Sequence, residues 1–309
     1  QSDPANYTVN ETVSSAYLMG DYTWDAWRIL AGVRMETTED EFTGKEVLFA
    51  ENGEYEQTID TEGGRTYNDY FPGLQAVYTA SNQLTLYSSW SKAVERPRYY
   101  YLAPFRRIVQ RSQYISAGNP DLKPTLFTSL LAAADWAYDE SGFLSLELLR
   151  RDNEDIVVQS QSVVPDGQFK DYDLYTWHNA GVGIHNQAQL VWNQGLEPLW
   201  YELDGFSLEM RYRYNDTETD VRGPEFETMP IALIPENDVR ASFIFQNQSW
   251  LLRLRADHRS EMLRRIGSIP DKDTYYFDKT TYTFSVEYRA GSGWTGNVGV
   301  YNINQDDPT

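Results

Sequence analysis

The sequence predicts an all-β fold: a transmembrane antiparallel up-and-down β-barrel, of which this chain holds about twelve strands. The main observation is that its turns sort by length, because segments with two-residue hydrophobic alternation are joined alternately by short turns and by long polar loops. The six short turns lie near Met19–Trp24, Ala80–Gln83, Asp139–Gly142, Asn193–Pro198, Gln246–Ser249 and Ala290–Gly293. The five long connections run roughly over Thr37–Arg65, Lys92–Lys123, Gln159–Tyr175, Asp216–Pro235 and Met262–Tyr275. Membrane barrels have tight turns at one end and long loops at the other, whereas a soluble sandwich has no reason to sort its turns this way.

The alternating segments are also long, and each short turn has an aromatic neighbour. Many segments run about 10 to 14 residues, which is longer than a typical soluble strand and enough for a tilted membrane span. The aromatic residues at or beside the short turns are Trp24, Tyr78, Trp136, Trp192, Trp250 and Trp294. Trp and Tyr at one level form an interfacial belt in membrane proteins. The alternative, that these rings fill a soluble core near the hairpins, does not account for the length of the segments.

Alternation assigns an apolar and a charged face to each strand. Along Trp250–Arg259, one face carries Trp250, Leu252, Leu254 and Ala256, and the other carries Leu251, Arg253, Arg255, Asp257 and Arg259. The same pattern places Leu208, Met210, Phe284 and Val286 on apolar faces. In a barrel the apolar face contacts lipid and the charged face lines a polar lumen, so we expect a continuous apolar belt on the convex surface.

Composition excludes several classes of protein. No run of about 18 apolar residues occurs, so a helical membrane span is not expected. The net charge of -20 argues against a nucleic-acid partner, and the absence of cysteine excludes disulfides and thiolate chemistry. The three histidines, His178, His185 and His258, have no metal-ligand spacing. No catalytic motif is found, so we expect neither an enzyme, a metal site nor a bound cofactor.

Acidic residues are concentrated in one segment. Between Glu36 and Glu62 there are ten carboxylates and a single lysine, Lys45. Charge of this density is typical of a solvated loop and not of a packed strand. We expect this loop outside the cell. Weak Ca²⁺ binding is one interpretation, because carboxylate oxygens suit hard divalent cations, and a merely solvated loop is the other.

Two motifs in sequence order carry a family resemblance. The stretch Leu84–Pro104 reads LTLYSSWSKAVERPRYYYLAP, with an S-x-A-x-x-R-P motif followed by L-A-P, and Gly118–Pro124 reads GNPDLKP. Both resemble signatures of TonB-dependent outer-membrane receptors. The segments Ala16–Glu39 and Phe143–Val158 also resemble barrel strands of that family. The resemblance covers nearly the whole chain.

The resemblance implies a function and a larger protein. Family barrels have 22 strands around an N-terminal plug domain, so residues 1–309 are expected to be part of such a barrel, without the plug and the final strand. The family imports scarce, bulky nutrients across the bacterial outer membrane with energy from the TonB complex. Implied partners are that complex through an N-terminal part, outer-membrane lipids and lipopolysaccharide, and a nutrient such as a siderophore or an oligosaccharide. The long acidic loops and aromatic mouth favour an oligosaccharide slightly.

Two groups of residues are candidates for substrate binding. In the loop Lys92–Lys123 they are Arg96, Arg98, Tyr99, Tyr100 and Tyr101. Such aromatic faces stack on sugars or planar chelates, and arginine binds carboxylate or phosphate. On the predicted lumen wall they are Arg211, Arg213, Arg253, Arg255 and Arg259.

Each group has a structural alternative. The loop aromatics can pack on one another over the barrel mouth. The wall arginines can pair with acids on a plug or on adjacent strands, such as Glu209, Asp257 and Glu287, and this is the favoured interpretation. For the whole chain, the alternatives are a passive porin, a barrel serving as adhesin or anchor, and a soluble β-rich binding module. A plug domain upstream favours the receptor over the porin.

Overall fold

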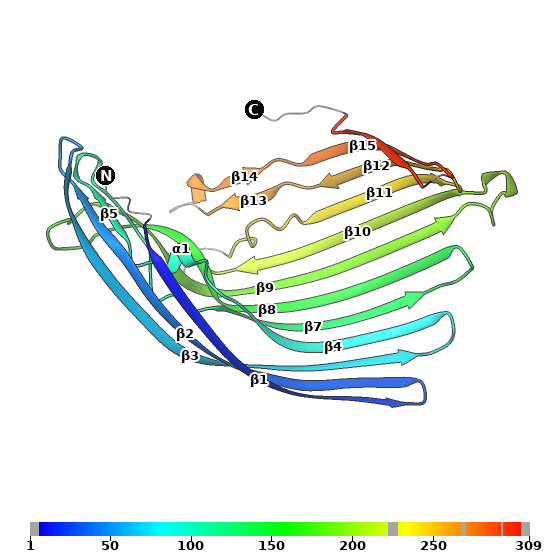
Figure 1. The fold of residues 1–309 in the computed structure, drawn as a ribbon, viewed down its shortest axis with the longest axis horizontal. Helices are drawn as coiled ribbons and strands as arrows, with labels where there is room; N and C mark the ends of the chain where they lie inside the picture. The colour runs from blue at the N-terminus through cyan, green and yellow to red at the C-terminus, as the bar shows by residue number, and fades with distance from the viewer. Residues whose placement is uncertain (1–5, 222–227, 267–269, 292, 304–309) are drawn as a thin grey trace.

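The computed structural model describes residues 6–221, 228–266, 270–291 and 293–303, and its main element is a curved open sheet (Figure 1). This sheet has 14 strands, of which β5 and β6 lie in a loop and the other twelve form the wall. The wall strands are β1 (Thr8–Trp24), β2 (Trp27–Phe49), β3 (Tyr55–Thr79), β4 (Leu84–Glu95), β7 (Thr125–Trp136), β8 (Gly142–Val163), β9 (Asp173–Gly195), β10 (Phe206–Thr219), β11 (Asn237–Gln246), β12 (Trp250–Arg259), β15 (Lys279–Arg289) and β16 (Thr295–Tyr301). Each pairs antiparallel with the wall strand before and after it, which confirms the predicted up-and-down order.

Strand register aligns the apolar residues into continuous rows across the convex face. Leu208 of β10 pairs with Phe243, which pairs with Leu254, and Leu254 pairs with Phe284. Leu254 is 49% exposed and Phe284 is 38% exposed, as expected for side chains that face lipid. Leu252, Val286 and Met210 lie in the same kind of row and are partly covered by their neighbours. The predicted apolar belt is therefore present.

Aromatic residues cluster beside the short turns, as predicted. The rings of Trp27 and Tyr78 lie 4.6 Å apart, and those of Trp250 and Tyr288 also lie 4.6 Å apart. Trp24, Trp136 and Trp294 are exposed. Amphipathic rings at this level are typical of a membrane interface.

Three predicted connections differ from the structure. The first short turn is residues 25–26 and not Met19–Trp24, because Gly20 continues β1 and Asp25 takes up the left-handed turn conformation with φ 55°. The turn after β9 is longer than predicted and spans residues 196–205, including the 3₁₀ turn η2 (Tyr201–Leu203). The long loop predicted over Thr37–Arg65 is a pair of strands, since β2 and β3 continue until a turn at residues 50–54.

The acidic segment forms strands and not the predicted solvated loop, because its alternation continues above the expected membrane. Glu36, Asp40 and Phe42 are buried on one face of β2, while Glu39 and Glu41 between them are exposed. A strand that extends beyond the bilayer meets water, so its outer face tolerates charge. The buried acids have partners: Arg65 donates to Asp40 at 2.8 Å across the β2–β3 ladder.

The connection from β4 to β7 folds back against the long-loop end of the wall. It contains the short helix α1 (Tyr99–Leu102), β5 (Arg106–Val109), the 3₁₀ turn η1 (Gln110–Ser112) and β6 (Tyr114–Ala117). β5 pairs in parallel with β2, β6 pairs in parallel with β9, and β5 and β6 pair with each other. This hairpin therefore bridges two strands that are far apart along the wall. A second small hairpin, β13 (Met262–Arg265) and β14 (Thr274–Tyr276), lies in the β12–β15 connection, next to η3 (Pro270–Lys272).

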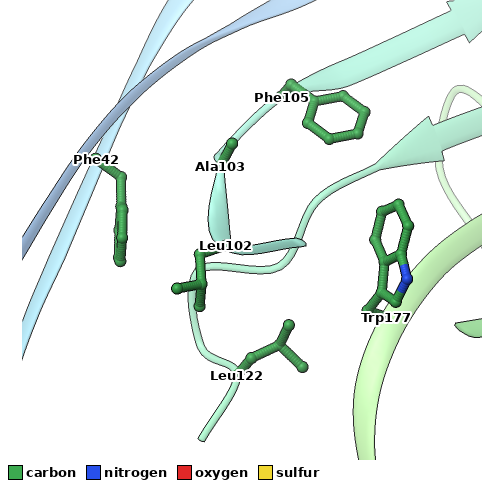
Figure 2. Packing of buried hydrophobic residues seen from close by; sticks show 6 residues of the cluster. All are labelled: Phe42, Leu102, Ala103, Phe105, Leu122 and Trp177. Carbon is green, nitrogen blue, oxygen red and sulfur yellow. The ribbon is translucent and has the colours of Figure 1, made fainter. Parts of the chain in front are cut away.

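The largest aromatic core lies under the β4–β7 connection. Its buried members are Phe42, Leu102, Ala103, Phe105, Leu122 and Trp177, shown in Figure 2. They come from β2, from the connection and from β9, so the core fastens the connection to both sides of the wall. Among the described residues, no helix is long and apolar enough to cross a membrane.

Candidate ligand cavity at the long-loop end

A cavity of about 380 Å³ opens beside the start of the β4–β7 connection. Its polar side is formed by Glu95, Arg96, Arg98 and Tyr101. Its apolar side is formed by Ile156, Val158, Val221, Ile231, Leu233 and Ile266. The structure thus brings three of the predicted site residues, Arg96, Arg98 and Tyr101, to one cavity. This volume lies within the range of ligand-binding pockets, and the wall combines apolar surface with a few convergent polar groups.

Arg96 is held by acids of β1 and β2. Its guanidinium donates to the Glu36 carboxylate and to the Thr38 hydroxyl, the latter at 3.2 Å, and lies 3.9 Å from Glu11. Glu36 also accepts from Arg34. Arg96 is the arginine of the S-x-A-x-x-R-P motif and directly follows the last residue of β4. Its contacts with β1 and β2 therefore fix the point at which the chain leaves β4.

Several polar atoms around Arg96 are buried without a hydrogen-bond partner. They are Nε of Arg96, the Tyr67 hydroxyl, Oδ1 of Asp40 and Oδ2 of Asp69. Thr38 pairs with Tyr67 and Glu36 pairs with Asp69 in the β2–β3 register, so these atoms belong to one stretch of the inner face. Buried donors and acceptors normally have a hydrogen-bond partner, so this group of atoms indicates that a further polar group binds here.

The three consecutive tyrosines have different surroundings. Tyr101 stacks on Trp177 with ring centroids 4.6 Å apart, and Tyr100 stacks on Phe105 at 4.8 Å. Tyr99 is 48% exposed and its hydroxyl donates to Glu11 at 3.2 Å. The loop aromatics therefore pack largely on one another, as the structural alternative held, and Tyr99 retains the largest free surface.

Electrostatics near the tyrosines keep their hydroxyls protonated. The Glu11 carboxylate, with a smaller contribution from burial, raises the pKa of Tyr99. Burial raises the pKa of Tyr100, and the neighbouring Tyr7 adds to the shift. Both groups are therefore neutral hydrogen-bond donors at physiological pH and do not repel an anion.

The five wall arginines lie away from this cavity, on β10 and β12. Arg211 donates to Asp238 at 3.2 Å, and Arg255 donates to Asp257 at 2.5 Å. Arg213 donates to Gln189 at 2.9 Å, and the Arg259 guanidinium lies 5.6 Å from the centre of the Tyr276 ring. Nε of Arg253 is buried without a partner. Asp257 also accepts from Arg240, so acids of adjacent strands partly neutralise the basic face.

Sequence reasoning missed residues that are distant along the chain. Trp177 forms the floor under Tyr101, and Asn119 of the GNPDLKP motif donates to the Trp177 carbonyl at 2.9 Å. The apolar cavity wall from residues 231–233 was also missed, because these residues were assigned to a polar loop. For residues 231–233 the sequence signal was the run of apolar residues inside a segment predicted as a polar loop. Trp177 lies in a strand and its sequence position gives no sign of the contact with Tyr101.

The fold and the two-faced wall define a membrane-type β-barrel segment with a ligand-sized cavity at its long-loop end. Residues 1–303 match the sequence profile described as TonB dependent receptor-like, beta-barrel. The chain therefore belongs to the TonB-dependent receptor family. No curated protein matches this sequence significantly.

Solved structures with the same fold are transport proteins. The copper transporter OprC superposes with a TM-score of 0.72 at 12% identity, covering 97% of this chain and 43% of OprC. The unliganded ferric citrate transporter FecA gives 0.69 at 15% identity, covering 97% and 41%. The ferric-catecholate import receptor Fiu from E. coli K12 gives 0.67 at 15% identity, covering 97% and 41%. The chain thus spans less than half the length of these relatives.

Proposed function

We propose that this chain forms part of the wall of a TonB-coupled importer in the bacterial outer membrane, and that its ligand is a scarce, bulky nutrient. The observation that carries the proposal is the two-faced sheet. Apolar rows such as Leu208–Phe243–Leu254–Phe284 cover its convex side, while arginine–carboxylate pairs cover its concave side. Such a wall suits lipid outside and a polar interior inside.

The energy coupling and the partners follow from family membership. Members of the family take their energy from the TonB complex, which they contact through an N-terminal part. We propose the same complex as partner of the longer protein, together with outer-membrane lipids and lipopolysaccharide. The proposed role is transport and not catalysis.

We favour an anionic metal chelate over an oligosaccharide as the nutrient. Arg96 and Arg98 line the cavity, and guanidinium groups bind carboxylate and phenolate oxygens well. The similar structures include transporters of ferric citrate and copper and an import receptor for ferric catecholates. This replaces the slight preference for an oligosaccharide that the acidic loops suggested, since those residues form strands.

Uptake by the full-length receptor tests the proposal. A deletion strain is grown on a panel of iron, copper and carbon sources, and uptake of the labelled compound is measured with and without a functional TonB complex. We expect loss of growth on a metal chelate and uptake that requires TonB. Uptake that continues without TonB would support the porin alternative, and a growth defect on an oligosaccharide alone would overturn the choice of ligand.

A further inference from the structure

The apolar side of the ligand cavity is made of aliphatic side chains. It comes from β8 and from the β10–β11 and β12–β15 connections, through Ile156, Val157, Val158, Val221, Ile231, Ala232, Leu233 and Ile266. Val221 belongs to a small core with the buried Leu263, and Ile156 and Ile266 pack against this core. The aliphatic surface is therefore held in place from behind. Among the described residues that line the cavity, Tyr101 is the single aromatic one.

This lining suits a flexible alkyl group better than a planar ring. Tyr101 is stacked on Trp177, with ring centroids 4.6 Å and ring planes 18° apart, and the Arg98 guanidinium lies 6.0 Å from the centre of the Tyr101 ring. A flat ligand that binds by stacking on aromatic faces thus finds little free aromatic surface here. An alkyl chain needs no such geometry, because burial of apolar area is non-directional.

Leu233 is the exposed member of the apolar side, and its backbone conformation is unusual. It is 60% exposed and has φ 67°, in the left-handed region that leucine rarely adopts. Its N–H donates to the Leu263 carbonyl at 2.8 Å, which holds the residue in this position. A large apolar side chain exposed to water, on a backbone of unfavourable φ, points to a ligand that covers it.

The polar side of the cavity supplies hydrogen-bond donors for an anion. Arg98 is exposed, and a guanidinium has donors only. Arg96 already donates to Glu36, but its Nε is buried without a partner. Glu95 is exposed on the same side and opposes an anion in charge, so its removal should favour one. Arg98 is the group best placed to hold an oxyanion by charge-assisted hydrogen bonds.

We infer that the ligand of this cavity is an amphiphilic anion. Its carboxylate or similar oxyanion head accepts hydrogen bonds from Arg98, and its aliphatic chain lies on the apolar side and covers Leu233. The cavity of about 380 Å³ accommodates a chain of several carbons. The inference rests on the proposed function and specifies the nutrient further: the anionic chelate carries an alkyl or acyl arm.

Binding of straight-chain carboxylates to the purified full-length receptor tests the inference. Butanoate, hexanoate and octanoate are titrated, and their dissociation constants are measured by ligand-observed NMR. Each added methylene that is buried should strengthen binding about fourfold. Octylammonium, which has a cationic head on an alkyl chain, should bind more weakly than octanoate.

Variants separate the two halves of the site. Leu233→Asn removes the exposed apolar group at a φ that asparagine adopts readily, so it should keep the fold and flatten the dependence on chain length. Arg98→Gln should weaken all three carboxylates about tenfold and leave the dependence on chain length unchanged. Glu95→Gln should strengthen their binding by removing a like charge. The matched controls are Leu199→Asn, an exposed leucine beside a short turn, and Arg111→Gln, an exposed arginine elsewhere in the β4–β7 connection, and both should bind as the unchanged receptor does.

Several results would overturn the inference. Affinity that does not rise with chain length, or that rises equally in Leu233→Asn, would refute the aliphatic arm. Tighter binding of octylammonium, or unchanged binding in Arg98→Gln, would refute the anionic head. These outcomes are distinct from failure of the proposed function, because the titration needs no TonB: uptake that continues without TonB would refute the importer, while binding that depends on chain length and on Arg98 would still support the amphiphilic ligand.

Discussion

The guanidinium of Arg96 donates to the carboxylate of Glu36, which joins the end of β4 to the middle of β2. The Glu36 side chain is 8% exposed and that of Arg96 is 25% exposed, so water reaches this pair poorly. The contact ties the start of the β4–β7 connection to the wall. It also holds Arg96 at the edge of the ligand cavity.

Replacing Arg96 with Met should loosen the β4–β7 connection. Glu36 would keep only its contact with Arg34, and we expect a loss of about 1–3 kcal/mol of stability. Limited proteolysis across residues 97–123 should speed up, and chelate uptake should fall. The control is Arg111→Met, which changes an exposed arginine of the same connection. Equal protease resistance of the two variants would contradict the assigned role of Arg96.

Gly118 of the GNPDLKP motif should not tolerate alanine. A Cβ at this position would collide with the carbonyl oxygen of Ala103 in the L-A-P stretch, where the two motifs cross. The backbone has little room to move, because Gly118 N–H donates to the Phe105 carbonyl at 3.0 Å. We expect Gly118→Ala to destabilise the protein by about 1–3 kcal/mol, measured by thermal unfolding. Gly20→Ala, where a Cβ meets open space, should be close to neutral.

The faces of the strands could be predicted from sequence because side-chain direction alternates strictly along a strand. Leu254 and Arg255 are neighbours in the chain, and the structure places Leu254 in an apolar row and pairs Arg255 with Asp257. Turn lengths likewise identified the hairpins. The alternation depends only on the local backbone conformation, so the face of each side chain can be predicted without knowing which distant residues it contacts.

The candidate site could be predicted only in part, because its contacts are long-range. Arg96 and Arg98 could be chosen from their motif, but the packing of Trp177 under Tyr101 joins residues more than seventy positions apart. The acidic segment Glu36–Glu62 forms strands although its charge density predicts a loop, because its side chains still alternate between a buried and an exposed face. Beyond the bilayer, a strand with one solvent-exposed face can contain as many charged residues as a loop.

The pKa of His178 gives the long-loop end a pH dependence. Burial lowers this pKa below its ordinary value of about 6.5, so the folded state favours the neutral ring. His178 lies 14 positions before Trp192 on β9, roughly 45 Å along the strand and outside the ~25 Å apolar band. The stabilising effect is present above about pH 6.5 and is lost as the pH falls through the folded-state pKa. Hydrogen exchange of residues 173–179 should accelerate below pH 6, and His178→Gln should flatten this dependence.

Weak Ca²⁺ binding by the segment Glu36–Glu62 stays a prediction. Its carboxylates divide between the two faces of β2 and β3, and four of them already pair with cations: Glu36 with Arg34 and Arg96, Asp40 with Arg65, Glu46 with Arg106, and Asp60 with Lys45. Any Ca²⁺ binding is therefore expected at the exposed acids near the β2–β3 turn, with millimolar affinity. Isothermal titration of the full-length receptor measures it. Absence of heat up to several millimolar Ca²⁺ would leave the segment as a merely solvated hairpin.

Exchanging charge between the two faces of β12 tests the orientation of the wall. Arg255→Glu should leave membrane insertion intact, because the side chain faces the polar interior. It would replace the cation that pairs with Asp257 by a second carboxylate, and uptake should be impaired. Leu254→Arg puts a cation on the lipid side, at a cost of about 2–4 kcal/mol near the bilayer centre, and should impair assembly. Heat-modifiable gel mobility measures assembly, and labelled ligand measures uptake. If Arg255→Glu fails to assemble while Leu254→Arg assembles normally, the strand faces the opposite way, and both the lipid belt and the lumen wall are assigned to the wrong sides.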